Sequence, residues 1–216
     1  MSVLSANEIT ALLRRGELVV TPLLPPVRID AGTIDIRLGR HFVTFRKSRF
    51  LGTDVLETVR EAEAEPTRSA KVDRLSIEVG RTVERVTIEL GESFVLHPGQ
   101  LVLACTLEYL ALPATVGAQV LSRSTTGRLG ILSATATYFH PNFRGVPTLE
   151  LVNTSETALS VTPGLRIAQL LLEEAHTNPY EPGRYQLTTR PQIARLSRDA
   201  ELEALAGLRP SVDHLA

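Results

Sequence analysis

Two groups of polar side chains in the middle of the chain could together bind an anion and move a proton. The first is the run Arg123-Ser124-Thr125-Thr126-Gly127-Arg128, in which two guanidiniums flank hydroxyl residues and a glycine. The second is Glu150, a carboxylate inside the apolar segment 147–152. Guanidiniums and hydroxyls bind phosphate or carboxylate groups, and a carboxylate can accept a proton from water. We therefore expect the function to lie in this part of the chain.

Each group also has an ordinary structural interpretation. Residues 123–128 open a turn or short helix, whose backbone N–H groups suit a phosphate, but they equally suit a capped surface helix with its arginines in water. Leu149 and Leu151 share one face of a strand, so Glu150 points to the other face. If that face is enclosed, the carboxylate needs a partner such as Arg128. If it is open to water, Glu150 is an ordinary polar residue.

Short apolar segments separated by turn residues must position these side chains. A period-2 segment lies between Gly32 and Gly39 and predicts a strand. The segments that follow it cover 83–90, 93–96, 101–112, 118–121, 147–153, 158–161 and 166–173. Many short strands at this spacing predict an all-β barrel or jelly roll rather than βαβ units.

Helical signals lie at the two ends of the chain. Ser5 can cap a helix over residues 5–15, because Glu8 completes a capping box and Gly16 follows the last turn. Leucines at helical spacing predict a small second helix over 199–208. We expect one β domain over 1–198, which includes an exposed insertion at 57–74 and a tail at 178–198, and a C-terminal extension over 199–216.

The composition argues against several classes of protein. Twenty-three Lys and Arg against 24 Asp and Glu leave no field that would attract nucleic acid or an anionic membrane. The single cysteine, Cys105, excludes an internal disulfide framework and a Cys-x-x-Cys metal site, and its apolar surroundings predict a buried, inert thiol. No run approaches the ~18 apolar residues of a membrane helix, and no signal peptide follows Met1. We expect a soluble, cytoplasmic protein with no nucleic-acid or membrane partner.

Residues 121–173 resemble the dCTP deaminase branch of the trimeric dUTPase-like superfamily. The matches to its motifs are Arg123-Ser124-Thr125-Thr126-Gly127-Arg128-Leu129-Gly130, Thr135-Ala136, Pro141-Asn142-Phe143-Arg144-Gly145, Thr148-Leu149-Glu150 and Pro163-Gly164-Leu165-Arg166-Ile167-Ala168-Gln169-Leu170. Weaker likeness covers 5–9, 34–39 and 184–186. The resemblance thus extends over nearly the whole chain to about residue 198.

The resemblance implies a mainly β, dUTPase-like barrel or jelly roll with a short N-terminal helix and minor helical additions. It implies a homotrimer with active sites between subunits, a pyrimidine nucleoside triphosphate carrying Mg²⁺, and no zinc. Glu150 would take a proton from the water that attacks C4 of cytosine, while Ser124 and Arg128 bind and orient the water and the departing amine. The implied substrate contacts are Arg123, Thr125, Ala136, His140, Phe143, Gln169, Tyr180, Arg184 and Gln186.

Departures from the family pattern leave three functions open. His140 stands where the family has an aspartate that contacts the 3′-hydroxyl in deaminases and activates water in the dUTPase relatives. Ser122, Thr125 and Ser133 also differ from the pattern, whereas Ser124, Arg128 and Glu150 are retained. The leading hypothesis is deamination of dCTP to dUTP and ammonia. The alternatives are a deaminase that also forms dUMP or a dUTPase-like hydrolase, and a non-catalytic nucleotide-binding homologue.

Overall fold

A computed structural model of the chain describes residues 2–23, 29–30, 32–45, 83–133, 138–175 and 185–193. Nearly all of them belong to one compact unit, which comprises Met1–Thr44 and Arg85–Gln192. A second unit comprises Phe45–Glu84 and Ile193–Ala216, and few of its residues are described. The predicted insertion at 57–74 and the predicted helix at 199–208 lie outside the described residues, so the domain organisation stays a prediction.

The N-terminal helix α1 (Ala6–Arg15) forms as the capping signals predicted. The backbone N–H of Glu8 donates to Ser5 Oγ (3.3 Å), and the backbone N–H of Ser5 donates to Glu8 Oε2 (2.7 Å), which completes the capping box. Gly16 ends the helix at φ 70°, a left-handed conformation that favours glycine. Ile9 and Leu12 bury the apolar face of the helix.

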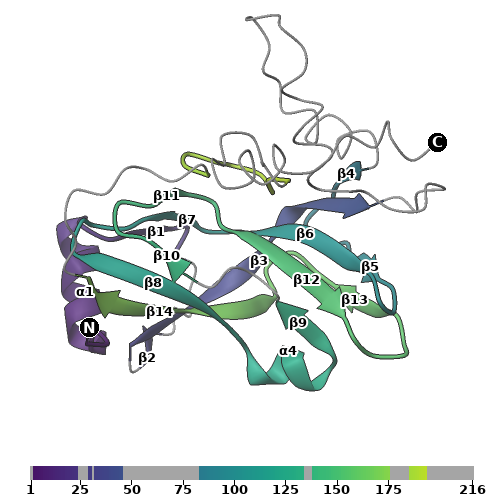
Figure 1. Cartoon of the computed structure of the whole chain (residues 1–216), viewed down its shortest axis with the longest axis horizontal. Coiled ribbons are helices and arrows are strands. Elements are labelled where there is room, and N and C mark those ends of the chain that lie inside the picture. The colour runs from purple at the N-terminus through teal and green to yellow at the C-terminus, as the bar shows by residue number, and fades with distance from the viewer. Residues whose placement is uncertain are drawn as a thin grey trace, which may run out of the picture. The chain divides into compact units, whose positions relative to one another are not determined.

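The other elements are strands and one short helix (Figure 1). Their bounds are β1 Val19–Thr21, β2 Ile29–Asp30, β3 Thr33–Phe45, β4 Val83–Thr87, β5 Phe94–Leu96, β6 Leu101–Thr106, β7 Tyr109–Ala111, β8 Val116–Ser122, α4 Ser124–Arg128, β9 Ile131–Ser133, β10 Tyr138–Phe139, β11 Arg144–Gly145, β12 Thr148–Asn153, β13 Leu159–Val161 and β14 Arg166–Glu174. The predicted mainly β fold with a short N-terminal helix is confirmed. The single predicted segment 101–112 is in fact two strands, β6 and β7, because the chain bends at Leu107 and Glu108.

Strand β3 links the two halves of the main sheet, whose order is β10-β8-β14-β3-β6-β12-β9. Its first part pairs with β14 and its second part pairs with β6, with a register shift between Leu38 and Phe42. The strand passes very close to β6 at Gly39, where an added Cβ would lie 2.6 Å from the carbonyl oxygen of Thr106. The sequence pattern suggested that this strand stops at Gly39. The glycine instead permits a close approach to β6, so that one strand can pair with both halves of the sheet.

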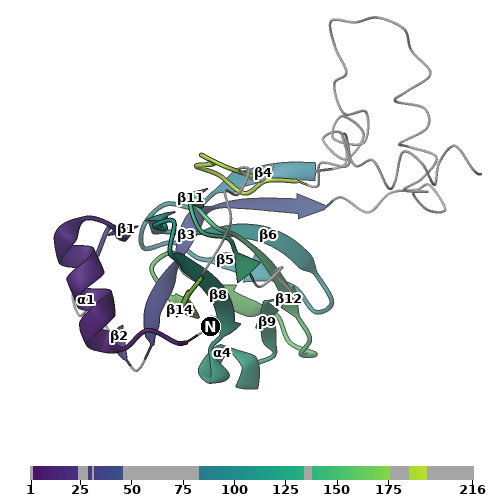
Figure 2. The same ribbon diagram turned by 60° about the vertical axis from the view of Figure 1, so that its left-hand side comes forward.

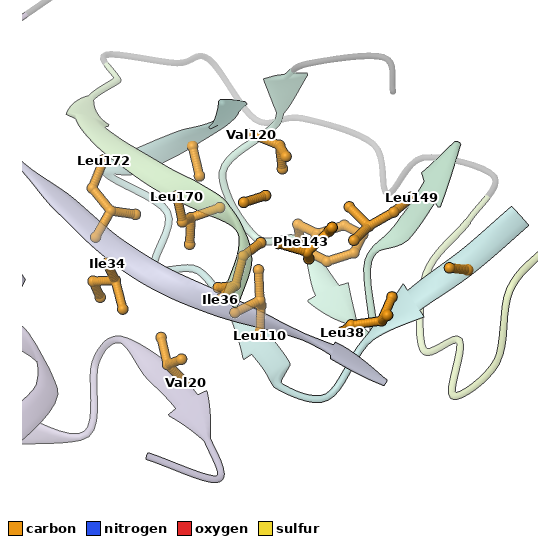
Figure 3. Packing of buried hydrophobic residues seen from close by; sticks show 14 of the residues in the cluster. Val20, Ile34, Ile36, Leu38, Leu110, Val120, Phe143, Leu149, Leu170 and Leu172 are labelled. Atoms are coloured by element: carbon orange, nitrogen blue, oxygen red, sulfur yellow. The ribbon is translucent and has the colours of Figure 1, made fainter. Parts of the chain in front are cut away.

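The core lies between the inward faces of these strands (Figure 3). Ile36, Leu38, Leu149 and Leu170 are among its fully buried side chains. Cys105 is also buried, on β6, and burial raises the pKa of its thiol, so the predicted buried cysteine is confirmed. In the described part of the chain, neither α1 nor α4 is long and apolar enough to cross a membrane.

Candidate functional site

Glu150 lies in the middle of β12 on the face opposite the core. Leu149 and Leu151 are fully buried on the inner side, and Glu150 is half-buried on the outer side, as the alternation predicted. Across the sheet Glu150 faces Leu103 of β6, which in turn faces Val43 of β3. Both of these apolar neighbours are buried. Burial raises the pKa of the Glu150 carboxyl, because water is partly excluded from the charged form.

A row of apolar side chains borders Glu150 on this outer face. Val152, two residues further along β12, lies between Leu101 of β6 and Leu132 of β9. Leu101 is 41% exposed and Leu132 is 46% exposed. The carboxylate therefore sits at the edge of an apolar patch, defined by Leu101, Val152 and Leu132, on the surface of the single chain.

The run 123–128 forms the short helix α4, which lies beside β9 (Figures 1 and 2). Arg123 precedes its first turn, and the buried Thr126 hydroxyl donates to the Arg123 carbonyl oxygen at 2.9 Å. Ser124, Thr125 and Arg128 are exposed. The hydroxyls of Ser124 and Thr125 and the guanidinium of Arg128 therefore lie at the surface, and no side chain of the N-cap residue caps the first turn.

The end of α4 is tied to the end of β12. Thr154 donates to the carbonyl oxygen of Gly130 through both its backbone N–H (2.8 Å) and its hydroxyl (2.9 Å). Gly130 has φ 91°, and an added Cβ there would lie 2.8 Å from Ser155 Cβ. The segment that carries Ser124 and Arg128 and the strand that carries Glu150 are thus joined at one corner of the sheet.

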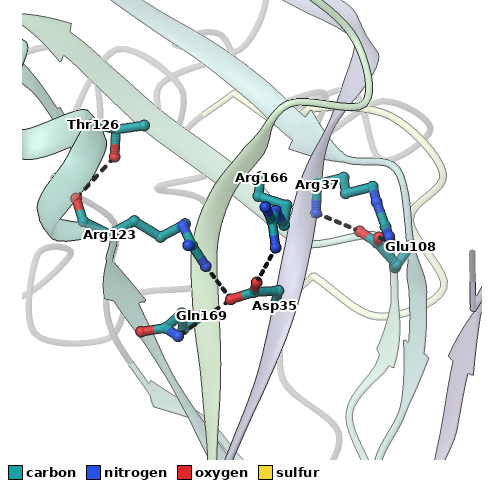
Figure 4. A network of polar contacts seen from close by, with 7 residues as sticks. All are labelled: Asp35, Arg37, Glu108, Arg123, Thr126, Arg166 and Gln169. Carbon is teal, nitrogen blue, oxygen red and sulfur yellow. Dashed lines mark hydrogen bonds and ion pairs between the residues drawn. The ribbon is translucent and has the colours of Figure 1, made fainter. Parts of the chain in front are cut away.

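Arg123 reaches Asp35 of β3 and joins a cluster that the sequence had not indicated as a site (Figure 4). Asp35 also accepts hydrogen bonds from Arg166 Nη1 (Oδ2, 3.3 Å) and Gln169 Nε2 (Oδ1, 3.2 Å), both on β14. The cluster, defined by Asp35, Arg123, Arg166 and Gln169, unites two of the predicted substrate-binding residues, Arg123 and Gln169. Asp35 and Arg166 had been noted only as matches to family motifs. In the sequence, the one feature that could have indicated this cluster is Asp35 itself, an acidic residue between two isoleucines of a predicted strand.

The remaining predicted site residues lie in different parts of the structure. Phe143 is 8% exposed and packs against Phe139, with ring centroids 4.6 Å apart, so in the single chain it belongs to the core. The His140 ring lies edge-on to that of Tyr138 at 5.1 Å. The side-chain oxygen of Gln186 accepts from the Arg144 backbone N–H at 2.8 Å, which fastens part of the tail onto β11. Ala136, Tyr180 and Arg184 lie outside the described residues.

No clustering of metal ligands is found among the residues that the structure describes. Within those ranges, no three His, Cys, Asp or Glu side chains lie close enough together to hold a metal ion. Glu150 is a carboxylate that can accept a proton, and Arg123 and Arg128 are guanidiniums that can bind an anion.

Comparison with known proteins points in the same direction. Residues 3–175 match the model of a family described as dCTP deaminase-like. The chain is 33% identical over 207 residues to a dCTP deaminase of Natronomonas pharaonis, and the match covers 92% of this chain and 97% of the relative. It is 30% identical to a dUMP-forming dCTP deaminase of Methanobrevibacter smithii, and that match covers 94% of this chain and 100% of the relative.

A solved structure supports the fold. The chain aligns with the crystal structure of 2′-deoxycytidine 5′-triphosphate deaminase from Agrobacterium tumefaciens with a TM-score of 0.56 and 24% identity. The alignment covers 80% of this chain and 48% of the other chain. At this level of identity, the comparison establishes a shared fold.

Proposed function

This chain belongs to the dCTP deaminase-like family, and from this premise we propose that it hydrolyses the C4 amino group of the cytosine of dCTP. The reaction consumes water, breaks a C–N bond and releases ammonia. The observation that carries the proposal is Glu150, a partly desolvated carboxylate on the outer face of β12, in a chain similar to dCTP deaminases over nearly its full length.

Glu150 acts as the general base in the proposed reaction. It takes a proton from the water that attacks C4 and gives this proton to N3. It then carries the proton of the new C4 hydroxyl to the amine, which leaves as ammonia. A carboxyl group whose pKa is raised by burial is a stronger base at neutral pH than an exposed one. Arg128, brought near Glu150 in the assembled site, would keep the carboxylate ionised enough to act.

Ser124 and Arg128 orient the water and the leaving amine in this proposal. Both are exposed on α4 in the single chain, and a site that excludes water needs a cover. The apolar patch of Leu101, Val152 and Leu132 beside Glu150 supplies a surface for that cover. We infer that the working unit is a homotrimer in which a second copy completes each site. Mg²⁺ would enter with the triphosphate as part of the substrate.

The proposed product is dUTP, with dUMP as the second candidate. Some relatives of similar identity are dUMP-forming dCTP deaminases, which favours the second candidate. His140 favours the first, because an imidazole orients water for attack on a phosphoanhydride less well than the aspartate of the family pattern does. A nucleotide-binding protein without catalysis is the third candidate, suggested by the departures at Ser122, Thr125, Ser133 and His140.

One assay separates these candidates. The full chain is incubated with dCTP, CTP, dCMP or dUTP and Mg²⁺, and ammonia and pyrophosphate are measured in the same samples. Ammonia without pyrophosphate from dCTP supports the dUTP-forming deaminase, and both products together support the dUMP-forming enzyme. Binding of dCTP with no ammonia from any cytosine nucleotide would refute the proposed deamination.

The substitution His140→Asp is expected to change the preference for the sugar of the substrate or the products that are released. An aspartate at this position restores an anionic group that can hold a sugar hydroxyl and a water molecule. We expect the ratio of kcat/KM for dCTP to kcat/KM for CTP to be larger in the variant than in the wild type, or pyrophosphate to be released. The measurement is kcat/KM for both nucleotides together with pyrophosphate release. His140→Asn is the control, because asparagine has the shape of aspartate but not its charge. If His140→Asp leaves both the dCTP/CTP preference and pyrophosphate release unchanged, this position does not decide the substrate or the products.

A further inference from the structure

Tyr138 of the edge strand β10 and His140, the first residue after this strand, present their rings to each other. The rings meet edge-on, with their centroids 5.1 Å apart and an angle of 88° between the ring planes. Side chains two residues apart share a face of a strand, and Phe139 between them packs inward against Phe143. His140 is exposed, whereas Tyr138 is half-buried. Tyr138 is therefore the inner member of the pair, and its ring limits the positions that the imidazole can take.

A glycine on the neighbouring strand β8 makes room for the tyrosine. In the pairing of β10 with β8, Tyr138 lies opposite Gln119, and its ring extends along β8 as far as Gly117. A Cβ added at Gly117 would lie 2.7 Å from Cζ of Tyr138 and closer still to its hydroxyl oxygen. The phenol ring therefore occupies the space that a side chain would fill at this position.

Two polar side chains border the hydroxyl end of the Tyr138 ring. Glu173 of β14 is 8% exposed and lies directly opposite Gly117. Gln119 donates from Nε2 to both carboxylate oxygens of Glu173 at 3.4 Å. Burial first, and this carboxylate second, raise the pKa of the Tyr138 phenol, so its hydroxyl keeps the proton at neutral pH. The ring is thus enclosed at its far end and stays neutral there.

The backbone of His140 is fixed as well. Its carbonyl oxygen accepts from the backbone N–H of Phe143 at 3.1 Å, which closes a turn over residues 140–143, and Asn142 in this turn has φ 65°. Strand β10 pairs with β8 up to the residue before His140. Because strand and turn hold the backbone, the imidazole keeps only the freedom of its own side-chain torsions, and the Tyr138 ring restricts that freedom.

We propose that Tyr138 is a positioning residue, which holds the imidazole of His140 in the orientation that binds the sugar of the nucleotide. A side chain that is already held in its binding orientation loses less conformational freedom when the ligand arrives, so the ligand binds more tightly. The only free hydroxyl on the sugar of dCTP is at C3′, because C5′ carries the triphosphate and C2′ carries no oxygen. An imidazole can recognise this hydroxyl as a donor or as an acceptor. The contact of His140 with the sugar rests on the proposed function, whereas the packing of Tyr138 over Gly117 rests on the geometry alone.

The test compares the binding of dCTP and of 2′,3′-dideoxy-CTP, which lacks the C3′ hydroxyl, by titration calorimetry with Mg²⁺. Every chain carries Glu150→Gln, so that bound dCTP is not consumed, and the ratio of the two dissociation constants is the hydroxyl preference. For Tyr138→Leu we expect the hydroxyl preference to fall by about threefold to tenfold, the contribution of one hydrogen bond. Tyr138→Phe, which keeps the ring, should stay within about twofold of the parent chain. Tyr109→Leu is the matched control, because Tyr109 is a half-buried tyrosine of β7, which pairs with β1 and β11 instead of β8.

Two double substitutions decide whether Tyr138 acts through His140. In a His140→Ala chain, Tyr138→Leu should leave the hydroxyl preference unchanged, because the imidazole that it positions is gone. Gly117→Ala should lower the preference as Tyr138→Leu does, because the added methyl group displaces the ring, and it should have no further effect in a Tyr138→Leu chain. An equal loss with and without His140 would overturn the positioning role. Should Tyr138→Leu fail to fold, Gly117→Ala with and without His140→Ala gives the same decision.

The outcomes separate this inference from the proposed function. A hydroxyl preference that falls in Tyr138→Leu only when His140 is present supports the positioning role, even if the wild-type chain releases no ammonia from dCTP. A parent chain without any hydroxyl preference, or a Tyr138→Leu variant that keeps it, would overturn the positioning role even if deamination proceeds normally. A chain that binds neither nucleotide would overturn this inference together with the proposed function.

Discussion

The substitution Glu150→Gln should lower the rate of ammonia release from dCTP by about 10²–10⁴-fold, the range that a positioned general base contributes. Glutamine has nearly the same shape as glutamate but cannot take a proton from water, so the loss should fall on kcat rather than on dCTP binding. The measurement is kcat and KM by ammonia release. Glu156→Gln is the control, because Glu156 is an exposed carboxylate in the turn after β12, and its activity should match the wild type. A Glu150→Gln variant with more than about a tenth of wild-type kcat would contradict the role of Glu150 as base.

The same substitution should make the fold more stable at neutral pH. Burial raises the pKa of Glu150 above its ordinary value of 4.5, so the folded chain keeps this proton to higher pH than the unfolded chain does. The group therefore lowers the free energy of unfolding as pH rises from 4.5 through the raised folded pKa, and the loss is complete above that pKa. Glu150→Gln removes this contribution. Urea unfolding between acid and neutral pH should show that the free energy of unfolding of the variant, relative to that of the wild type, increases as pH rises. A variant that is less stable than the wild type at neutral pH would contradict this expectation.

Asn153→Ala should destabilise the fold through the loss of a buried hydrogen-bonding side chain. Asn153 is fully buried at the end of β12, where its Nδ2 donates to the carbonyl oxygens of Leu96 (2.9 Å) and Thr157 (2.8 Å). Its Oδ1 accepts from the backbone N–H (2.9 Å) and the hydroxyl (2.7 Å) of Ser155. Removing the amide takes one hydrogen-bond partner from each of these groups, at a cost of roughly 1–3 kcal/mol for each group that water cannot reach. The Ser155 hydroxyl still donates to the carbonyl oxygen of the exposed Thr157 (3.0 Å).

Water can reach the partly exposed Ser155, so we expect a total loss of about 3 kcal/mol in the free energy of unfolding, measured by urea denaturation. Asn7→Ala on the exposed face of α1 is the control, and a surface substitution of this kind should stay within about 0.5 kcal/mol. A loss below about 1 kcal/mol in Asn153→Ala would show that the turn after β12 does not depend on this side chain.

Local signals in the sequence predicted a good part of the fold. The capping box of Ser5 and Glu8 and the glycine at 16 set the limits of α1, because caps act through neighbouring backbone groups. The alternation around Glu150 placed this carboxylate on the outer face of β12, because side chains alternate along any strand. Strands β2, β9, β10 and β11 were not predicted, although the equally short β5 and β13 were, because pairing with neighbouring strands rather than a pattern of their own defines them.

The predicted site could be recovered from the sequence only in part. The types and spacing of Ser124, Arg128 and Glu150 were enough to suggest proton transfer and anion binding, since that chemistry belongs to the side chains themselves. The position of Glu150 beside an apolar patch could not be read from the sequence. It depends on which strands become neighbours, as when Val152 comes to lie between Leu101 and Leu132.

The sequence by itself thus determined the short-range features: the helix and its caps, the many strands, and the outward direction of Glu150. Only the tertiary structure decided that β3 would serve both halves of the sheet and that a bulge in β14 would bring Arg166 to Asp35. Asp35 and Gln169 are 134 residues apart in the chain, yet they face each other across two paired strands. Contacts at such separation arise from strand register and backbone irregularities, which follow from the packing of the whole core rather than from local residue preferences.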